Sequence, residues 1–240
     1  MHDAFERFAL LVGSDAASRV ARSHVTVVGL GGVGGQAAEA LVRCGVGTLT
    51  LIDGDTVQMS NINRQIIAST RTLGRLKAEV MAERLLSINP DLAVRAVARY
   101  ITPETVDAAL SEPTDYVADA IDDMNAKIAL IAACWERGIP IVSSAGAARR
   151  LDPTQLACVD LFSTQYDPMA RRMRRRLREL GVTALDVVCS REQPVPTRLD
   201  PRQNKHIGGS AVFVTATAGL LLARHVVMRL AAAGGEPDAP

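Results

Sequence analysis

Four glycines near the start of the chain have the spacing of a backbone turn that holds phosphate. Residues 25–29 are apolar and predict a strand that ends in this turn, and residues 35–44 predict the helix that follows. Glycine lets the backbone bend sharply and approach an anion where a Cβ would block it, and a helix N-terminus favours negative charge. A packing turn without a ligand is the alternative. The spacing favours a nucleotide site at Gly29, Gly31, Gly32 and Gly34.

An acidic side chain ends the second predicted strand, residues 48–53. Asp53 comes 19 residues after Gly34, where a carboxylate can accept hydrogen bonds from both hydroxyls of a ribose. An NAD-dependent oxidoreductase would place an acid similarly, so Asp53 predicts a nucleoside without distinguishing ATP from NAD. Asp55 follows two residues later, and we expect it either to assist Asp53 or to be a surface charge.

Two cations after the second strand separate these alternatives. Arg64 and Lys77 follow Asp53 in a chain that contains three lysines. When ATP reacts at its α-phosphate, negative charge develops there and on the leaving pyrophosphate, and a pair of cations stabilises that charge. Hydride transfer needs no such pair. The order of the residues therefore favours ATP over NAD, with a structural arginine and a surface lysine as the alternative.

Another acidic group follows the predicted strand 116–120. Asp122 lies past the end of that strand, where its carboxylate can hold an Mg²⁺ ion bound to a triphosphate. Asp119 is predicted to be a buried structural acid. Asp123 can instead be the N-cap of the helix predicted at 125–137. The sequence therefore predicts Mg²⁺ as well as ATP at this end of the sheet.

Strand-like and helical segments alternate along the chain. Strands are predicted at 25–29, 48–53, 93–98, 116–120, 140–144 and 156–161, and helices at 35–44, 76–88, 103–110, 125–137 and 169–180. This alternation predicts an α/β fold, a Rossmann-like, doubly wound and mostly parallel sheet with a C-terminal extension. We expect one ATP-binding domain over residues 1–240. Its expected parts are a nucleotide core at about 20–146, a basic substrate-side extension at about 147–206 and an apolar segment at 207–230.

Positive charge is concentrated after the nucleotide motifs. The chain has 240 residues and a formal net charge of +1, but residues 147–205 carry 12 Lys and Arg against 7 Asp and Glu. The predicted helix 169–180 supplies half of these cations. Its arginines predict contacts with nucleic-acid phosphates, and a solvated face without a partner is the alternative. These arginines are Arg171, Arg172, Arg174, Arg175, Arg176 and Arg178.

The remaining composition bears on where the protein works. Residues 207–223 form the longest uncharged run, about 25 Å as a helix, which is slightly short for a membrane span. We expect a buried core segment there, and peripheral or anchored membrane association is the alternative. The four cysteines form no C-x-x-C pair, and no secretory signal opens the chain. A cytoplasmic protein is therefore predicted. Residues 190–206 are rich in Pro, Arg and Asp and are expected to form a loop.

Five motifs together resemble those of the ubiquitin-activating-enzyme superfamily, which includes the bacterial adenylating enzymes of thiamine and molybdopterin synthesis. They are Gly-Leu-Gly-Gly-Val-Gly, Leu-Ile-Asp-Gly-Asp-x-Val, Ser-Asn-Ile-Asn-Arg-Gln, Gly-x-x-Lys and Asp-Ala-Ile-Asp-Asp, and they cover residues 25 to 123. The resemblance implies a protein that binds Mg-ATP and transfers AMP to a carboxylate.

The resemblance also implies roles for single residues. Gly32 would approach the phosphates, Asp53 would hold the ribose, and Asn61 would lie at the phosphate site. Arg64 and Lys77 would hold the phosphates, and Asp122 would serve the metal ion. Arg7 matches a position from which family members often supply an arginine across a dimer interface, so a homodimer is expected.

The second half of the chain resembles the tRNA threonylcarbamoyladenosine dehydratase branch of this superfamily. The resemblance rests on Gly146 to Gln155, on Asp167-Pro168 with the arginine helix, and on Gly209-Ser210-x-x-Phe213-Val214-Thr215-Ala216. It implies ATP-dependent activation of the threonyl carboxylate on adenosine 37 of tRNA, followed by ring closure with net loss of water. The expected partner is therefore tRNA that carries threonylcarbamoyladenosine.

Other functions remain open at this point. An adenylyltransferase for a ubiquitin-like sulfur carrier would share the ATP site, but that branch commonly carries two C-x-x-C pairs for zinc, which this sequence lacks. A sulfur-relay protein stays a possible partner. A non-catalytic subunit of the superfamily is disfavoured, because Arg64, Lys77 and Asp122 are all present.

Overall fold

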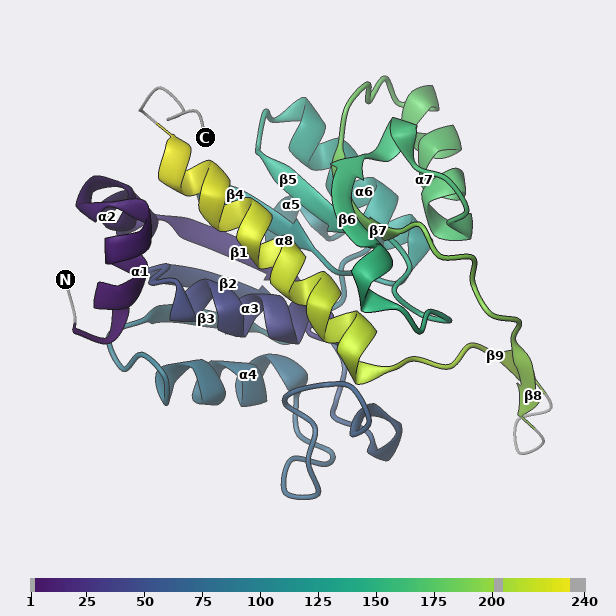
Figure 1. The fold of residues 1–240 in the computed structure, drawn as a ribbon, viewed down its shortest axis with the longest axis horizontal. Helices are drawn as coiled ribbons and strands as arrows, with labels where there is room; N and C mark the ends of the chain where they lie inside the picture. The colour runs from purple at the N-terminus through teal and green to yellow at the C-terminus, as the bar shows by residue number, and fades with distance from the viewer. Residues whose placement is uncertain (1–2, 201–204, 234–240) are drawn as a thin grey trace.

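The centre of the computed structural model, which describes residues 3–200 and 205–233, is a seven-stranded sheet (Figure 1). Its strand order is β3-β2-β1-β4-β5-β7-β6, and β6 is the only one of these strands that runs antiparallel to its neighbour. The order reverses between β1 and β4. The strands are β1 His24–Val28, β2 Thr48–Ile52, β3 Ala93–Val97, β4 Tyr116–Asp119, β5 Ile141–Ser144, β6 Leu156–Asp160 and β7 Asp186–Ser190.

Helices cover both faces of the sheet. One face carries α3 (Gly34–Arg43), α4 (Lys77–Leu86) and α8 (Val212–Ala232), and the other carries α5 (Val106–Ala109) and α6 (Met124–Glu136). α7 (Pro168–Glu179) packs beside α6. Two further helices, α1 (Glu6–Val12) and α2 (Ser14–Arg22), lie at the amino ends of the strands. Short 3-10 turns occur at Asp3–Phe5, Met59–Asn61, Pro153–Gln155 and Leu161–Ser163.

Alternating apolar side chains of the strands explain the two-faced core. Val27 and Leu51 are buried in the cluster that includes α3, α4 and α8, whereas Val28 and Ile52 are buried in the cluster with α5 and α6. Successive strand residues point to opposite faces, and burial on both faces is typical of a parallel sheet. The predicted Rossmann-like, mostly parallel sheet is therefore confirmed.

Several local predictions were wrong. The predicted loop 190–206 contains β8 (Arg198–Asp200) and β9 (Lys205–Ile207), which form a small separate antiparallel pair. β7 was not predicted. The helix predicted at 103–110 shortens to the four residues of α5.

The C-terminal helix α8 is the longest helix in the described residues. Its length and composition would allow it to cross a membrane, but 44% of its most apolar window is buried against the protein. The predicted core segment 207–223 overlaps its first half, and Figure 1 shows the helix lying diagonally across the sheet and α3. Gly219 permits this close packing, because a Cβ there would come 2.4 Å from the carbonyl oxygen of Val33.

Candidate active site

A cavity of about 560 Å³ opens at the carboxyl ends of the strands, where the strand order reverses between β1 and β4. Ligands in doubly wound sheets bind at this kind of position. Most of the residues predicted for the nucleotide site line the cavity together, although they come from three different segments of the chain: the loop after β1, the loop after β2 with the start of α4, and the loop after β4. Those that do are Gly29, Gly31, Gly32, Asp53, Asp55, Arg64, Lys77 and Asp122.

The glycine turn is held against β4 by contacts that leave no room for side chains. Gly29 has a φ of +85°, and a Cβ there would lie 2.7 Å from the carbonyl oxygen of Ala120. A Cβ on Gly34 would lie 1.7 Å from the carbonyl oxygen of Gly29, so Gly34 serves packing and does not line the cavity. Gly32 faces the first turn of α8, with Thr215 Oγ1 3.0 Å from the position of its Cβ. The turn is therefore preorganised and open to a phosphate.

Asp53 connects the end of β2 to the glycine turn. Its Oδ2 accepts a hydrogen bond from the backbone N–H of Leu30 at 2.6 Å, and its Oδ1 accepts one from Asp55 at 2.8 Å. A carboxylate has about four acceptor positions, so two remain for ribose hydroxyls. Burial raises the pKa of Asp53, and the nearby Lys77 ammonium only partly offsets this effect.

Lys77 is the first residue of α4, and its ammonium is tied to Asp55. Lys77 Nζ lies 2.7 Å from Asp55 Oδ2, and the lysine side chain is 6% exposed. Burial acts to raise the pKa of Asp55, but hydrogen bonds from Lys77 and Tyr100 outweigh it and lower that pKa. Asp55 thus holds the Lys77 ammonium at a fixed position in the wall of the cavity.

Arg64 lies in the loop between β2 and α4. Its Nη1 donates to the carbonyl oxygen of Ser60 at 2.8 Å and to Asn63 Oδ1 at 3.0 Å, which holds the half-buried guanidinium at the cavity. Asn61 is buried and is not among the residues that line the cavity; its Oδ1 accepts from the Gln58 N–H and its carbonyl accepts from the Arg64 N–H. Asn61 therefore shapes the loop that carries Arg64.

The three acids after β4 have different environments. Asp122 is exposed and lines the cavity, where its oxygens suit an Mg²⁺ ion. Asp123 caps α6 by accepting from the N–H groups of Asn125 and Ala126, both at 2.9 Å. Asp119 is fully buried and paired with Lys127 Nζ at 2.7 Å. Asp122 and Asp123 therefore both line the cavity, but one oxygen of Asp123 is already engaged in capping α6.

Ser144 lies at the end of a predicted strand, but most of the far side of the cavity was not foreseen from the sequence. Ser144 ends β5, and together with residues 145–148 it lines the far side with small side chains; Met169 from the first turn of α7 joins them. Gln65 also lines the cavity, and its buried Oε1 has no hydrogen-bond partner among the described residues. Its place in the Asn-Arg-Gln motif was the available signal. The small residues of the far wall carry no comparable signal.

A family model for the ThiF family matches residues 5–238. The chain belongs to the ThiF family. It is 39% identical to the tRNA threonylcarbamoyladenosine dehydratase of Bacillus subtilis (strain 168), with 94% of each chain covered. It is 40% identical to the enzyme of the same name from Escherichia coli (strain K12), with 93% of this chain and 92% of that one covered.

A solved structure of this ThiF-family fold holds a nucleotide. The E. coli tRNA N6-threonylcarbamoyladenosine dehydratase TcdA in complex with AMP superposes with a TM-score of 0.89 at 42% identity, covering 95% of this chain and 94% of that one. The same enzyme in complex with ATP gives a TM-score of 0.86. The likeness confirms the resemblance inferred from the motifs.

Two predicted groups lie outside the cavity. Arg7 is exposed on α1, at the amino ends of the strands, so within one chain it is remote from the glycine turn (Figure 1). Among the α7 arginines, Arg174 bonds the carbonyl oxygen of Thr164 at 2.9 Å, Arg176 bonds Asn125 Oδ1 at 2.8 Å, and Arg178 lies over the Phe162 ring. The other three, Arg171, Arg172 and Arg175, are exposed.

Proposed function

We propose that this protein is an ATP-dependent dehydratase that activates the carboxylate of threonylcarbamoyladenosine at position 37 of tRNA and closes it into a ring with loss of water. The observation that carries the proposal is the convergence of the glycine turn, Asp53, Arg64, Lys77 and Asp122 on one cavity. The dehydratases that resemble this chain over more than nine-tenths of its length support the choice of substrate.

In the proposed reaction, the substrate carboxylate attacks the α-phosphate of ATP in line with the departing pyrophosphate. Arg64 and Lys77 stabilise the charge that develops on the phosphates, and Asp53 with Asp55 positions the ribose. Asp122 would hold the Mg²⁺ ion bound to the triphosphate. A nitrogen or oxygen of the same modified base then displaces AMP and closes the ring, so the protein supplies no nucleophile of its own.

The far side of the cavity offers room for the second substrate. A nucleoside in a folded tRNA has to leave its stack to reach a catalytic pocket. The small side chains of residues 145–148 and the flexible thioether of Met169 line the cavity beyond the glycine turn. We assign this wall to the modified adenosine, with its carboxylate directed toward the phosphates.

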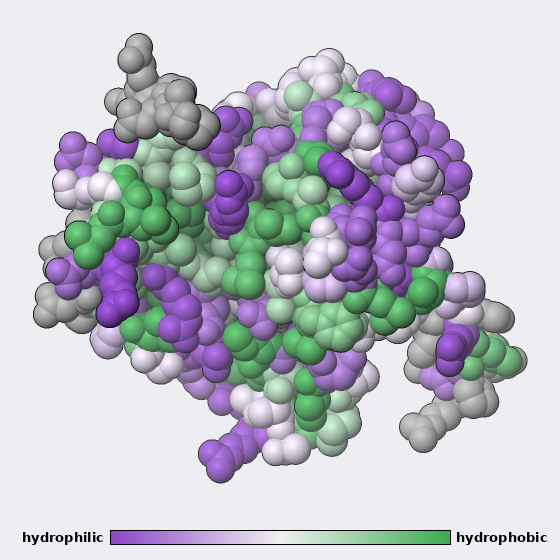
Figure 2. Space-filling view, in the orientation of Figure 1, coloured by the Kyte–Doolittle hydropathy of each residue, from purple (hydrophilic) through white to green (hydrophobic). Residues whose placement is uncertain are grey.

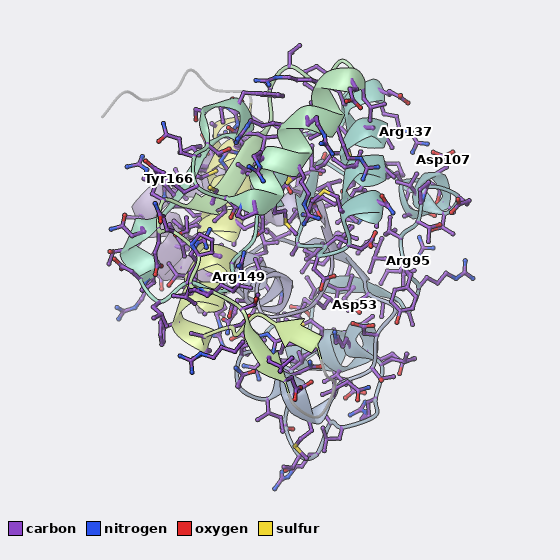
Figure 3. All side chains as sticks on the ribbon, turned by 90° about the vertical axis from the view of Figure 1, so that its right-hand side faces the viewer. Asp53, Arg95, Asp107, Arg137, Arg149 and Tyr166 are labelled. Carbon is purple, nitrogen blue, oxygen red and sulfur yellow. The ribbon has the colours of Figure 1, made fainter. Side chains whose placement is uncertain are left out.

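The exposed face of α7 is proposed to contact the tRNA backbone. Met169 lines the cavity, and the exposed Arg171, Arg172 and Arg175 follow it along the same helix. Figure 2 shows the hydrophilic surface over this helix at the upper right of the molecule. Arg174, Arg176 and Arg178 contribute less to RNA binding, because their guanidinium groups already have partners within the chain.

Other parts of the proposal concern assembly and location. A homodimer would allow Arg7, which is remote from the cavity of its own chain, to reach that of the partner. A tRNA substrate favours a cytoplasmic protein. Contact with a sulfur-relay protein is compatible with this assignment, and membrane contact through residues 207–223 would rest on the length and apolar composition of α8.

The direct test is a mass measurement on the nucleoside. We expect the protein, incubated with Mg-ATP and threonylcarbamoylated tRNA, to produce a nucleoside lighter by one water, about 18 Da. ATP without Mg²⁺ should support little conversion. A protein that leaves this tRNA unchanged, but exchanges pyrophosphate when given a carrier protein that ends in two glycines, would instead be an adenylyltransferase for a sulfur carrier.

The tRNA contact has a separate test based on salt. Replacing Arg171, Arg172 and Arg175 with glutamine should weaken tRNA binding and reduce the slope of log K against log salt by roughly two units, since each phosphate contact contributes about 0.7–0.9. The matched control is glutamine at Arg22, Arg43 and Arg95, which removes the same charge elsewhere. An unchanged slope in the α7 variant would show that this face is merely solvated.

A further inference from the structure

A tyrosine outside every recognised motif is joined to the lysine of the nucleotide site. The Tyr100 hydroxyl, in the loop after β3, donates a hydrogen bond to Asp55 Oδ1 at 2.7 Å. The other oxygen of the same carboxylate, Asp55 Oδ2, accepts from Lys77 Nζ at 2.7 Å. One carboxylate thus connects the loop after β3 to the first residue of α4, and both its oxygens are engaged.

The backbone around this carboxylate is also fixed. Asp55 donates its N–H to Asp53 Oδ1 at 2.8 Å, and its carbonyl oxygen accepts the N–H of Lys77 at 3.0 Å. A hydrogen-bonded path therefore runs from the Leu30 N–H of the glycine turn through Asp53 and Asp55 to Lys77. Tyr100 is the one member of this path that no sequence motif includes.

The position of Lys77 explains why its ammonium needs support. It occupies the first residue of a ten-residue helix, where the positive end of the helix dipole disfavours a cation. The side chain is 6% exposed, so water screens this repulsion poorly. Asp55 offsets it, and a carboxylate held at both oxygens cannot rotate away from the ammonium.

Tyr100 also packs closely on the nucleotide loop. A Cβ on Gly54 would come within 2.7 Å of two carbons of the Tyr100 ring, so the ring lies directly on the backbone between Asp53 and Asp55. Both Tyr100 and Gly54 line the cavity, and the tyrosine remains 63% exposed. The contact of the ring with Gly54 therefore holds the Tyr100 hydroxyl next to Asp55.

We propose that Tyr100 is a positioning residue that acts through Asp55 to fix the ammonium of Lys77 for the reacting phosphates. This inference rests on the proposed ATP-dependent function. Loss of the hydroxyl lets the Asp55 carboxylate turn and lets Lys77 occupy several positions. Binding of ATP in the ground state is shared with the glycine turn, Asp53 and Arg64 and changes little. Stabilisation of the transition state requires one position of the Lys77 ammonium, so it decreases when the lysine occupies several positions.

The test is Tyr100→Phe, which keeps the ring and removes the hydroxyl. We expect kcat to fall about tenfold while KM for ATP changes less than about twofold. The effect should vanish in an Asp55→Asn background, because the hydroxyl then has no charged partner to position. Wild-type kcat in Tyr100→Phe, or a loss that adds fully to that of Asp55→Asn, would overturn the proposal.

Tyr116→Phe is the matched control. The Tyr116 hydroxyl also has a side-chain partner, His225 Nε2 at 3.0 Å, but it lies at the amino end of β4, away from the cavity. We expect its kcat to remain at the wild-type value. An equal fall in both variants would mean that loss of any tyrosine side-chain hydrogen bond disturbs the protein, and the proposal would fail.

A second readout does not depend on turnover. In nucleotide-free protein, acetylation of Lys77 by an N-hydroxysuccinimide ester, followed by peptide mass spectrometry, should be severalfold faster in Tyr100→Phe than in wild type. Lys127, which is fully buried, should stay unlabelled in both proteins, and its labelling would report unfolding of the variant. If Lys77 is labelled at the same rate in both proteins, the inference about Tyr100 is contradicted, whether or not the wild-type protein consumes ATP. If the wild type is inactive but Lys77 is labelled faster in the variant, only the proposed function is contradicted.

Discussion

Two lysine–carboxylate pairs of equal length lie on opposite sides of the parallel strands. Lys77 Nζ and Asp55 Oδ2 are 2.7 Å apart at the cavity, and Lys127 Nζ and Asp119 Oδ2 are 2.7 Å apart in the core. They differ in surroundings. Both side chains of the core pair are 0% exposed, whereas Asp55 is 50% exposed.

The difference lies in what else the charged groups can bind. Lys127 also donates to Ser143 Oγ at 3.0 Å, Ser143 donates to Asp119 Oδ2 at 2.6 Å, and the second Asp119 oxygen accepts from the N–H of Ile121. That closed arrangement leaves no access for a ligand. The pair at the cavity shares its wall with the glycine turn. We therefore expect equal distances to accompany different roles, one in folding and one in chemistry, with access to a ligand as the difference between them.

The largest expected effect comes from breaking the core pair. Lys127→Met leaves Asp119 as an uncompensated buried charge, which should lower the free energy of unfolding by about 3–5 kcal/mol. Urea unfolding measures this directly.

A second substitution refines this test. Asp119→Asn added to Lys127→Met removes the stranded charge and should recover part of the lost stability. If Lys127→Met alone costs less than about 1 kcal/mol, the core pair has no structural role of this kind and the contrast with Lys77 fails.

The next effect concerns the pair at the cavity. Lys77→Ala should reduce turnover by roughly 10²-fold or more, since it removes a cation from the developing phosphate charge. Turnover of threonylcarbamoylated tRNA under saturating Mg-ATP is the measurement, with urea unfolding of the same variant beside it. Wild-type turnover would remove Lys77 from the mechanism, and a loss of stability as large as that of Lys127→Met would erase the distinction between the pairs.

The smallest expected effect concerns the half-buried pair of His225 and Asp186 and the pH dependence of stability. His225 Nε2 lies 3.3 Å from Asp186 Oδ2 and near the Tyr116 hydroxyl, and its Nδ1 lies 3.3 Å from Cys158 Sγ. Burial lowers the pKa of His225 and outweighs the opposing attraction of Asp186, and the nearby Arg229 also lowers it. The folded state therefore binds fewer protons than the unfolded chain just below pH 6.5, and stability falls as the pH drops through that range.

Replacing this histidine tests whether His225 lowers or raises the stability of the protein as the pH drops. His225→Asn should make the fall in melting temperature between about pH 6.5 and pH 5 shallower than in wild type, because the replacement does not titrate there. A steeper fall in the variant would mean that the pair with Asp186 outweighs burial.

Sequence reasoning selected residues that the structure brings to one cavity where short-range spacing carries the signal. Gly34 is required by a backbone contact within the turn itself and Gly29 by its positive φ, and Asp53, Arg64 and Lys77 follow the turn at characteristic spacings. It failed where a role depends on distant contacts. Nothing in the sequence around Tyr100 indicates that its hydroxyl meets Asp55, 45 residues earlier. Periodicity likewise could not identify β7, whose pairing with β5 and β6 is entirely non-local.

The contact of α8 with the glycine turn has a consequence for biosynthesis. Thr215 lies against Gly32, and Gly219 lies against Val33, although 183 residues separate the first two in the chain. At about 5–20 residues per second, a ribosome needs roughly 10–40 s to make that interval. A nascent chain therefore carries its glycine turn for many seconds without the helix that braces it, so the wall formed by Thr215 is completed only after nearly the whole chain has been made.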